Sequence, residues 1–216
     1  MLKENKRTLI IASVITILPI IIGIFLWNSF PDVMATHFGA DNEGNGFSSK
    51  AFAVIGIPMI LLAVEWIGAL VTAHDPRKQN ISPKMFSIML WIVPVISIVA
   101  TATMYSYNLG YKMNITFFAE LVMGLAFVVL GNYLPKARQN YTIGIKTPWT
   151  LSNEDIWNRT HRLAGYLWVV GGITIVVFSL IGFTKVYLML AIIAVMAVIP
   201  YIYSYSLQVK HHNLQS

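Results

Sequence analysis

The chain has 216 residues, of which 56% are hydrophobic and only 11% are charged, and its net charge is +6. A soluble domain carries roughly 25% charged residues and needs them to cover its surface, so a soluble fold is excluded. A disordered chain is excluded because such chains are polar, and a disulfide-stapled secreted fold is excluded because there is no cysteine. What remains is an integral membrane protein.

Six apolar stretches are long enough to cross a bilayer, which takes about 20 helical residues. They are Thr8–Asn28, Ala51–Ala73, Met85–Tyr107, Ile115–Leu134, Leu163–Phe183 and Val186–Leu207. The sequence therefore predicts an all-α integral membrane protein with six transmembrane helices. We expect two modules, namely residues 1–84 with two helices and an external loop (29–50), and residues 85–216 with four helices and a cytoplasmic loop (135–162).

The lysines and arginines indicate the orientation. If the N-terminus is cytoplasmic, all of the fifteen Lys and Arg residues except Lys50, Lys112 and Lys185 fall on the cytoplasmic side. The positive-inside rule thus predicts that both termini are cytoplasmic. The excess of positive charge is a topology signal, and nucleic acid is not an expected partner.

The first external segment, residues 29–50, is predicted to form a short flap after the first helix. Val33–Phe38 is rich in residues that favour strands, and Gly44–Gly46 is suited to a tight turn because glycine tolerates positive φ. Ser48 or Ser49 is placed to cap the second helix.

The flap also holds candidate binding residues. Its acids exceed its single lysine, which predicts an acidic outer surface, and Asp32, His37 and Asp41 are the candidates on it. One histidine among scattered carboxylates is a weak metal signal. We therefore expect a recognition surface or an ordered lid, with no metal and no cofactor.

Two carboxylates lie within the spans, Glu65 in the second and Glu120 in the fourth. A charged group at membrane depth costs about 2.5–3.5 kcal/mol, so each is a functional candidate. The helical rise places Glu120 about 8 Å and Glu65 about 21 Å from the outer end, so the two are not expected to form a pair. One interpretation is that they bind a ligand or form part of a proton or cation relay. The other is that each is protonated or hydrogen-bonded to polar neighbours between helices.

The cytoplasmic loop, residues 135–162, is dense in polar, aromatic and turn-forming residues. Ser152 with Asp155 resembles a capping box that opens a helix running on into the fifth span. Trp157 and His161 share one face of that helix. The pattern indicates a functional or partner-binding platform, although aromatic anchoring at the membrane interface would also use such residues.

These two segments together resemble the SdpI-type immunity proteins, bacterial plasma-membrane proteins that protect against a secreted toxic peptide. In the inner segment the matching residues are Asn132, Tyr133, Leu134, Pro135, Lys136, Asn140, Gly144, Ile145, Lys146, Thr147, Pro148, Trp149, Thr150, Leu151, Trp157, Thr160, His161 and Arg162. In the outer segment the match runs from Pro31 through Thr36–Gly39 to Lys50. Lys146 departs from the pattern, because the family more usually has arginine there, and lysine lacks the planar bidentate fork of arginine.

A membrane-embedded enzyme acting at the inner face through His161 is a further alternative, but no nucleophile–base spacing or metal cluster supports it, so no enzyme is expected. The resemblance implies a protein that shields its cell from a toxic peptide. It also implies signalling, in which the inner loop tethers a cytoplasmic transcriptional repressor once toxin is present. The implied partners are the lipid bilayer, the secreted peptide and this repressor. The peptide-binding candidates are then Asp32, His37, Asp41, Glu65 and Glu120. The alternative is a small proton- or cation-coupled transporter that uses Glu65 and Glu120.

Overall fold

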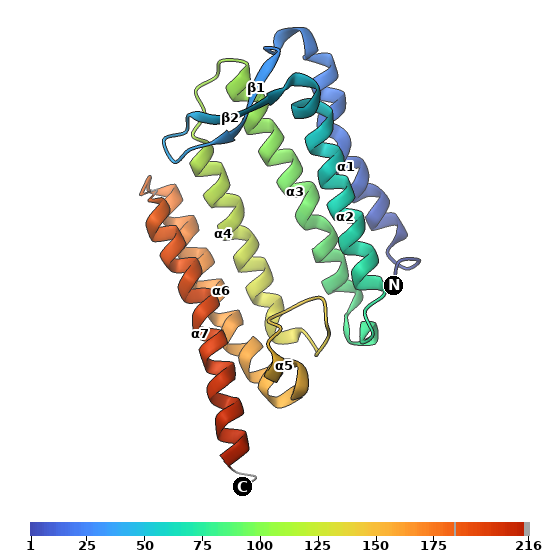
Figure 1. Ribbon diagram of the computed structural model, residues 1–216, viewed down its shortest axis with the longest axis vertical. Helices are drawn as coiled ribbons and strands as arrows, with labels where there is room; N and C mark the ends of the chain where they lie inside the picture. The colour runs from blue at the N-terminus through green and yellow to red at the C-terminus, as the bar shows by residue number, and fades with distance from the viewer. Residues whose placement is uncertain (184, 214–216) are drawn as a thin grey trace. The chain divides into compact units, whose positions relative to one another are not determined.

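The computed structural model describes residues 1–183 and 185–213, and within them six helices are long and apolar enough to cross a membrane (Figure 1). They are α1 (Lys6–Phe25), α2 (Ile57–Ala73) with the π-helical turn η2 (Phe52–Gly56) before it, α3 (Pro83–Asn108), α4 (Ile115–Tyr133), α6 (Glu154–Leu180) and α7 (Val186–Asn213). The expected spans and the all-α class are confirmed. The largest difference is that α6 begins at Glu154 instead of Leu163, because the end of the cytoplasmic loop is itself helical.

Shorter elements connect the spans. They are η1 (Trp27–Ser29), β1 (Val33–Phe38), β2 (Gly44–Ser49), η3 (Lys78–Asn80), η4 (Leu134–Lys136) and α5 (Pro148–Ser152). The chain divides into two compact units, one made of residues 1–70 and 87–122 and the other of residues 71–86 and 123 onward. The helices α2, α3 and α4 therefore each contribute to both units. The module boundary after residue 84 stays a prediction.

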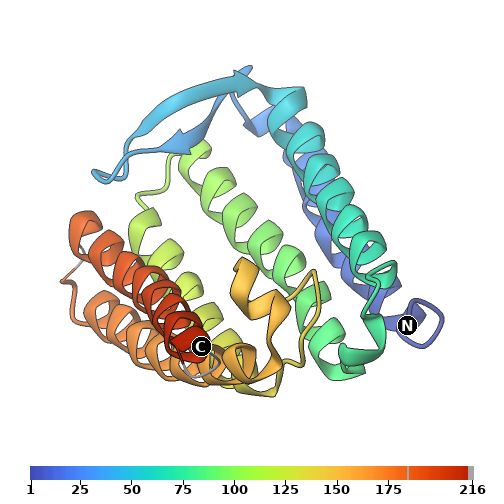
Figure 2. The same cartoon turned by 60° about the horizontal axis from the view of Figure 1, so that its bottom comes forward.

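In the first unit the flap (residues 29–50) is an antiparallel hairpin of β1 and β2, and Figure 2 shows it lying across the end of α3. The expected turn at Gly44–Gly46 is wrong, since these residues belong to β2. The chain reverses before them, where Asn42 has a φ of 65°. A side chain at Gly46 would clash, since a Cβ there would lie 2.8 Å from the Cβ of His37. A Cβ at Gly44 would likewise lie 2.7 Å from the Cβ of Ala35, so both glycines allow the two strands to pack closely.

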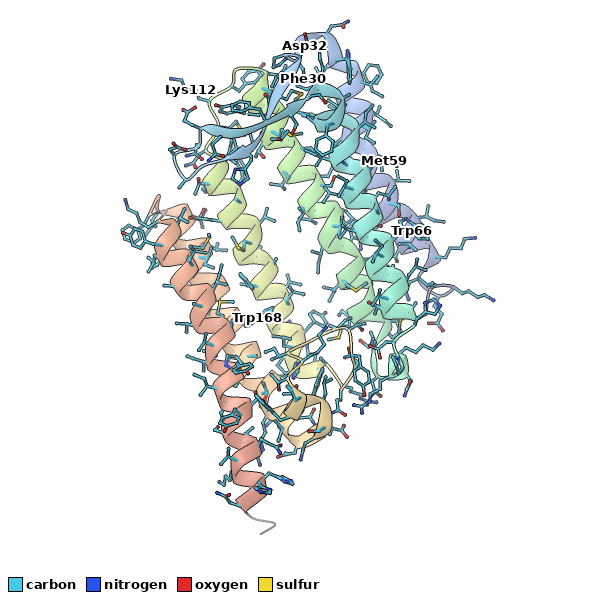
Figure 3. The ribbon with its side chains drawn as sticks, viewed as in Figure 1. Phe30, Asp32, Met59, Trp66, Lys112 and Trp168 are labelled. Carbon is cyan, nitrogen blue, oxygen red and sulfur yellow. The ribbon has the colours of Figure 1, made fainter. Side chains whose placement is uncertain are left out.

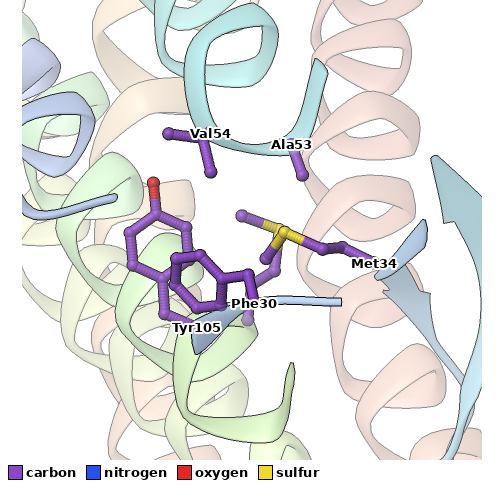
Figure 4. Close-up of a cluster of buried hydrophobic side chains, with 6 residues drawn as sticks. Phe30, Met34, Ala53, Val54 and Tyr105 are labelled. Atoms are coloured by element: carbon purple, nitrogen blue, oxygen red, sulfur yellow. The ribbon is translucent and has the colours of Figure 1, made fainter. Parts of the chain in front are cut away.

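The hairpin packs on an apolar cluster of the first unit (Figure 4). The buried members are Phe30, Met34, Ala53, Val54, Met104 and Tyr105. The rings of Phe30 and Tyr105 have centroids 4.9 Å apart, and the Tyr105 hydroxyl donates to the carbonyl of Pro19 at 3.1 Å. The flap is therefore held by the same core that joins the helix ends. At its far end the Ser49 hydroxyl accepts from the amide of Phe52 (3.3 Å), so Ser49 is the cap that the sequence predicted.

In the second unit α6 packs against α7 on one side and against α4 on another. The indole of Trp168, labelled in Figure 3, donates to the carbonyl of Met196 at 3.2 Å, and its ring meets the edge of Phe127. The seam between α4 and α6 is lined by four glycines at seven-residue spacing, Gly124 and Gly131 facing Gly172 and Gly165. Small residues let helix backbones approach closely within a membrane.

Candidate functional site

Each of the three candidate binding residues on the flap has its own interaction partner within the chain. Asp32 forms an ion pair with Lys50 (3.1 Å), His37 bonds to the Asn45 amide oxygen (2.5 Å), and Asp41 accepts from a backbone amide. In residues 1–183 and 185–213 no group of three or more His, Cys, Asp or Glu side chains is placed to hold a metal ion. The three residues therefore offer separate polar contacts on one surface.

In the Asp32–Lys50 pair, the lysine has further hydrogen bonds that hold it in place, whereas the aspartate has a highly exposed side chain. The Lys50 ammonium also donates to the carbonyls of Trp27 (3.2 Å) and Phe30 (3.1 Å), whereas the Asp32 side chain is 98% exposed. Figure 3 shows Asp32 at the flap. An exposed pair of this kind is worth at most about 1 kcal/mol. The carboxylate is consequently available to a cationic ligand.

The end of α3 holds the flap in place. The Asn108 amide oxygen accepts from the amide of Ala35 (2.8 Å), and its amide nitrogen donates to the carbonyl of the same residue (2.9 Å). The Tyr107 hydroxyl donates to the Glu43 carboxylate (3.0 Å) and accepts from the amide of Gly44 (3.1 Å). These two anchors were not among the predicted site residues, although adjacent polar residues at the end of a span were a usable signal.

Replacing Asn108 with alanine is expected to loosen the hairpin without unfolding the helices, because it leaves both backbone groups of Ala35 without their partner. Two lost hydrogen bonds correspond to a local destabilisation of about 2 kcal/mol. Hydrogen exchange at the Ala35 amide should accelerate on the order of thirtyfold. Asn45→Ala is the control, since Asn45 bonds only to the side chain of His37 in the described chain and its loss should leave that exchange rate unchanged.

Glu65 belongs to α2, faces α1 and is only 3% exposed. Its two carboxyl oxygens accept hydrogen bonds from the hydroxyls of Ser13 (3.0 Å) and Thr16 (2.6 Å), and the Trp66 indole donates to the Ser13 hydroxyl (3.1 Å). Among the residues that the structure describes, Lys, Arg and His form no ion pair with it. The site is therefore suited to receive a cationic group.

Glu120 on α4 is also buried, with 4% of its surface exposed. Within the described residues its carboxyl group takes part in no hydrogen bond. Both residues are thus buried within the first unit, but of the two only Glu65 has hydrogen-bond partners for its carboxyl group in the described chain.

The motif loop, residues 135–162, is closed by Asp75, a buried residue from the connection between α2 and α3. The Asp75 carboxylate accepts from the amides of Arg77 (2.7 Å) and Tyr141 (2.9 Å) and from the hydroxyl of Thr142 (2.8 Å). Asn140, fully buried, bridges the loop by donating to the carbonyls of Arg138 and Ile143. Sequence reasoning missed Asp75, because nothing local marks the partner of a distant loop.

Trp157 and His161 form the centre of the motif loop, with stacked rings 4.0 Å apart. The Trp157 indole donates to the carbonyl of Ala137 (2.7 Å). The Nε2 atom of His161 accepts from the amide of Ile145 (2.9 Å), so the ring hydrogen sits on Nδ1 and donates to the carbonyl of Trp157 (2.8 Å). His161 is thus neutral and structural in this arrangement. Gly144, with a φ of 124°, passes against these rings.

The short helix α5 carries Trp149 onto α7. The Trp149 indole donates to the hydroxyl of Ser204 (2.5 Å), and Thr147 with Thr150 forms a capping box at the start of α5. The capping box expected at Ser152 is wrong. Ser152 ends α5, and the side chain of Asn153 caps α6 by accepting from two amides.

The predicted motif residues therefore divide by exposure. Buried in the folded loop are Asn140, Thr147, Thr150, Trp157, Thr160 and His161, and half-buried are Gly144 and Trp149. Exposed are Asn132 near the end of α4 and, on the loop, Pro135, Lys136, Lys146, Pro148 and Arg162. The Lys136 ammonium lies 4.8 Å from the ring centre of Tyr133, and that of Lys146 donates to the carbonyl of Thr142 (3.2 Å). The buried set builds the loop, and the exposed set is what a partner could touch.

Comparison with known proteins shows which families these segments resemble. Residues 136–204 match the SdpI/YfhL protein family, and residues 14–62 match a domain of unknown function (DUF1648). The chain is 28% identical over 188 residues to the immunity protein SdpI of Bacillus subtilis (strain 168), covering 85% of this chain and 86% of that protein. The resemblance to the SdpI-type proteins is confirmed. No solved structure matches the chain.

The SdpI/YfhL match spans most of the motif loop, α5, α6 and much of α7, whereas the other match spans most of α1 and the flap. With its six apolar helices, this SdpI-like chain is a multi-pass bacterial membrane protein. Asp75, Tyr107 and Asn108 lie outside both matched segments. These residues hold the matched segments in shape, which neither motif reveals.

Proposed function

We propose that this protein gives its cell immunity to a secreted antimicrobial peptide. The observation that carries the proposal is its similarity to the immunity protein SdpI along 85% of the chain. The predicted orientation places the flap outside, where a secreted peptide arrives. The acids of the flap exceed its one lysine, so a cationic peptide would be attracted to it.

The peptide-binding groups in this proposal are Asp32, His37 and Asp41 on the flap, with Glu65 and Glu120 deeper in the spans. Exposure of Asp32 and the absence of a cationic partner for Glu65 in the described chain support these assignments. A basic group of the peptide that reached Glu65 would meet a carboxyl group flanked only by neutral hydroxyls.

The test is expression of the protein in a sensitive bacterium that is then challenged with the peptide fraction secreted by the source bacterium. Wild type should raise the inhibitory concentration at least tenfold, and Glu65→Gln should remove most of that protection. Glu154→Gln, on the exposed first turn of α6, is the matched control and should protect fully. Failure of the wild type to protect would contradict the proposal, and full protection by Glu65→Gln would remove that residue from it.

The second part of the proposal concerns signalling through the motif loop to a cytoplasmic transcriptional repressor. The exposed cations Lys136, Lys146 and Arg162 stand on a loop that its buried residues keep rigid, which supports a role as a docking surface. A ligand shifts such a surface only if it binds one conformation better than another. A toxin-dependent change in repressor co-purification, lost in Arg162→Ala, would support this part.

The alternative function is a proton- or cation-coupled transporter using Glu65 and Glu120. The burial of both carboxyl groups within candidate spans favours it. Its test is proton-gradient-dependent flux in liposomes containing the purified protein. Flux that is abolished by Glu65→Gln would favour the transporter, and protection in the challenge assay without any flux would favour immunity.

A further inference from the structure

The flap is a sheet of only two strands, so it has two outer edges. Along an antiparallel strand, backbone N–H and C=O groups point alternately toward the partner strand and away from it. The amide of Lys50 donates to the carbonyl of Asp32 across the hairpin (2.9 Å), so that pair faces inward. Counting along the register, Val33 and Ala35 then face outward on β1, and Ser49 and Phe47 face outward on β2.

The outer edge of β1 is already occupied. The Asn108 side chain pairs with both the N–H and the C=O of Ala35, at 2.8 and 2.9 Å, as a neighbouring strand would. This contact uses the central outward position of the strand. A further strand could not pair there without displacing the side chain that anchors the flap.

The outer edge of β2 has no such cover. Asn45, Phe47 and Ser49 are all exposed, and Phe47 has 62% of its surface accessible, so its ring could contact a strand added beside it. In the part of the chain that the structure describes, no hydrogen bond from outside the hairpin reaches the backbone of Phe47. An open edge of this kind is a template for the addition of another strand.

The charges of the flap itself indicate what its open edge would take up. Residues 29–50 contain three acids (Asp32, Asp41 and Glu43) and one lysine, a net charge of −2. A second copy of this chain would bring an equally acidic hairpin, and anionic headgroups would be repelled as well. A cationic peptide in an extended conformation has complementary charge, and its apolar residues could pack on Phe47.

We propose that the open edge of β2 binds an extended segment of a cationic peptide as a third strand, paired with the outward backbone groups of Phe47. The inference rests on the proposed immunity function and names how the peptide is recognised. Backbone pairing supplies the affinity, while the acids Asp41 and Glu43 at the hairpin end supply the preference for positive charge. Recognition would then tolerate changes in the peptide sequence that keep its charge and its extended conformation.

The test uses the full-length protein, the sensitive bacterium and the secreted peptide fraction of the challenge assay, with three flap variants. Phe47→Pro removes the outward N–H, Phe47→Ala removes only the ring, and Val33→Pro removes an outward N–H from the edge of β1. Proline is tolerated on edge strands, and thermal unfolding with size-exclusion chromatography checks that each variant folds as wild type does. The expected result is a fall in the inhibitory concentration of roughly tenfold for Phe47→Pro, with Phe47→Ala and Val33→Pro within about threefold of wild type.

Four outcomes overturn the inference while wild type still protects. Full protection by Phe47→Pro would show that the edge is not used, and equal losses in Phe47→Pro and Phe47→Ala would assign the effect to the ring. A loss in Val33→Pro as large as in Phe47→Pro would point to the hairpin as a whole. A dimeric wild type that becomes monomeric in Phe47→Pro would assign the edge to a second copy. Absence of protection by wild type would contradict the proposed immunity function itself, so failure of that function can be told apart from failure of the edge-binding proposal.

Discussion

Replacing Asp75 with alanine is expected to lower the free energy of unfolding by about 3–5 kcal/mol, the largest effect of any single carboxylate that we predict here. The substitution leaves the amides of Arg77 and Tyr141 and the hydroxyl of Thr142 without their shared acceptor. Because Asp75 is only 3% exposed, water cannot readily replace it. We expect the motif loop to detach from the connection between α2 and α3 while the helices persist.

The measurement is thermal unfolding in detergent combined with limited proteolysis between residues 137 and 147. Asp155→Ala is the matched control, since the Asp155 carboxylate pairs with Arg159 at 3.0 Å on an exposed surface. Such a pair contributes less than about 1 kcal/mol, so that variant should melt and resist protease nearly as wild type does. Equal stability of the two variants would mean that Asp75 does not hold the loop.

Replacing Gly172 with alanine should destabilise the contact between α4 and α6 by on the order of 2 kcal/mol, or about 4–8 °C in melting temperature. A Cβ at this position would lie 2.6 Å from the carbonyl oxygen of Gly124 and 2.9 Å from the amide nitrogen of Val128. Both neighbours are backbone atoms, so the helices must separate to relieve the contact. That separation weakens packing along the whole seam.

Gly68→Ala in α2 is the control for the general effect of alanine in a helix. A Cβ at Gly68 meets nothing within 4 Å, so the substitution should be neutral or should stabilise by up to about 1 kcal/mol. Thermal unfolding of both variants in the same detergent gives the comparison. A melting temperature for Gly172→Ala at or above that of Gly68→Ala would contradict close backbone packing at the seam.

Much of the candidate site was visible in the sequence because its residue types are unusual for a membrane protein. The flap hairpin, the cap at Ser49 and the density of the motif loop all followed from local residue patterns. The errors were also local in kind. The turn is predicted at Gly44–Gly46, where Gly44 instead makes room for Ala35 and Gly46 for His37. The cap of α6 is predicted at Ser152, whereas Asn153 provides it.

The roles of the motif residues could not be deduced from the sequence in the same way. Trp157 and His161 were predicted on one helix face, and they do stack, but only the fold shows that His161 accepts from the amide of Ile145. From the sequence, a histidine among basic residues is a candidate for catalysis or for partner binding. Its contacts make it an internal support of the loop.

The sequence by itself determined that this chain crosses the membrane six times, because the cost of burying a helix in lipid is a sum over adjacent residues. Only the tertiary structure decided which polar groups meet. Asp75 and Tyr141 are separated by 66 residues, and Asn108 and Ala35 by 73, yet each pair is joined by a hydrogen bond. Such partners are selected by the packing of whole helices, and no local pattern of residues records that choice.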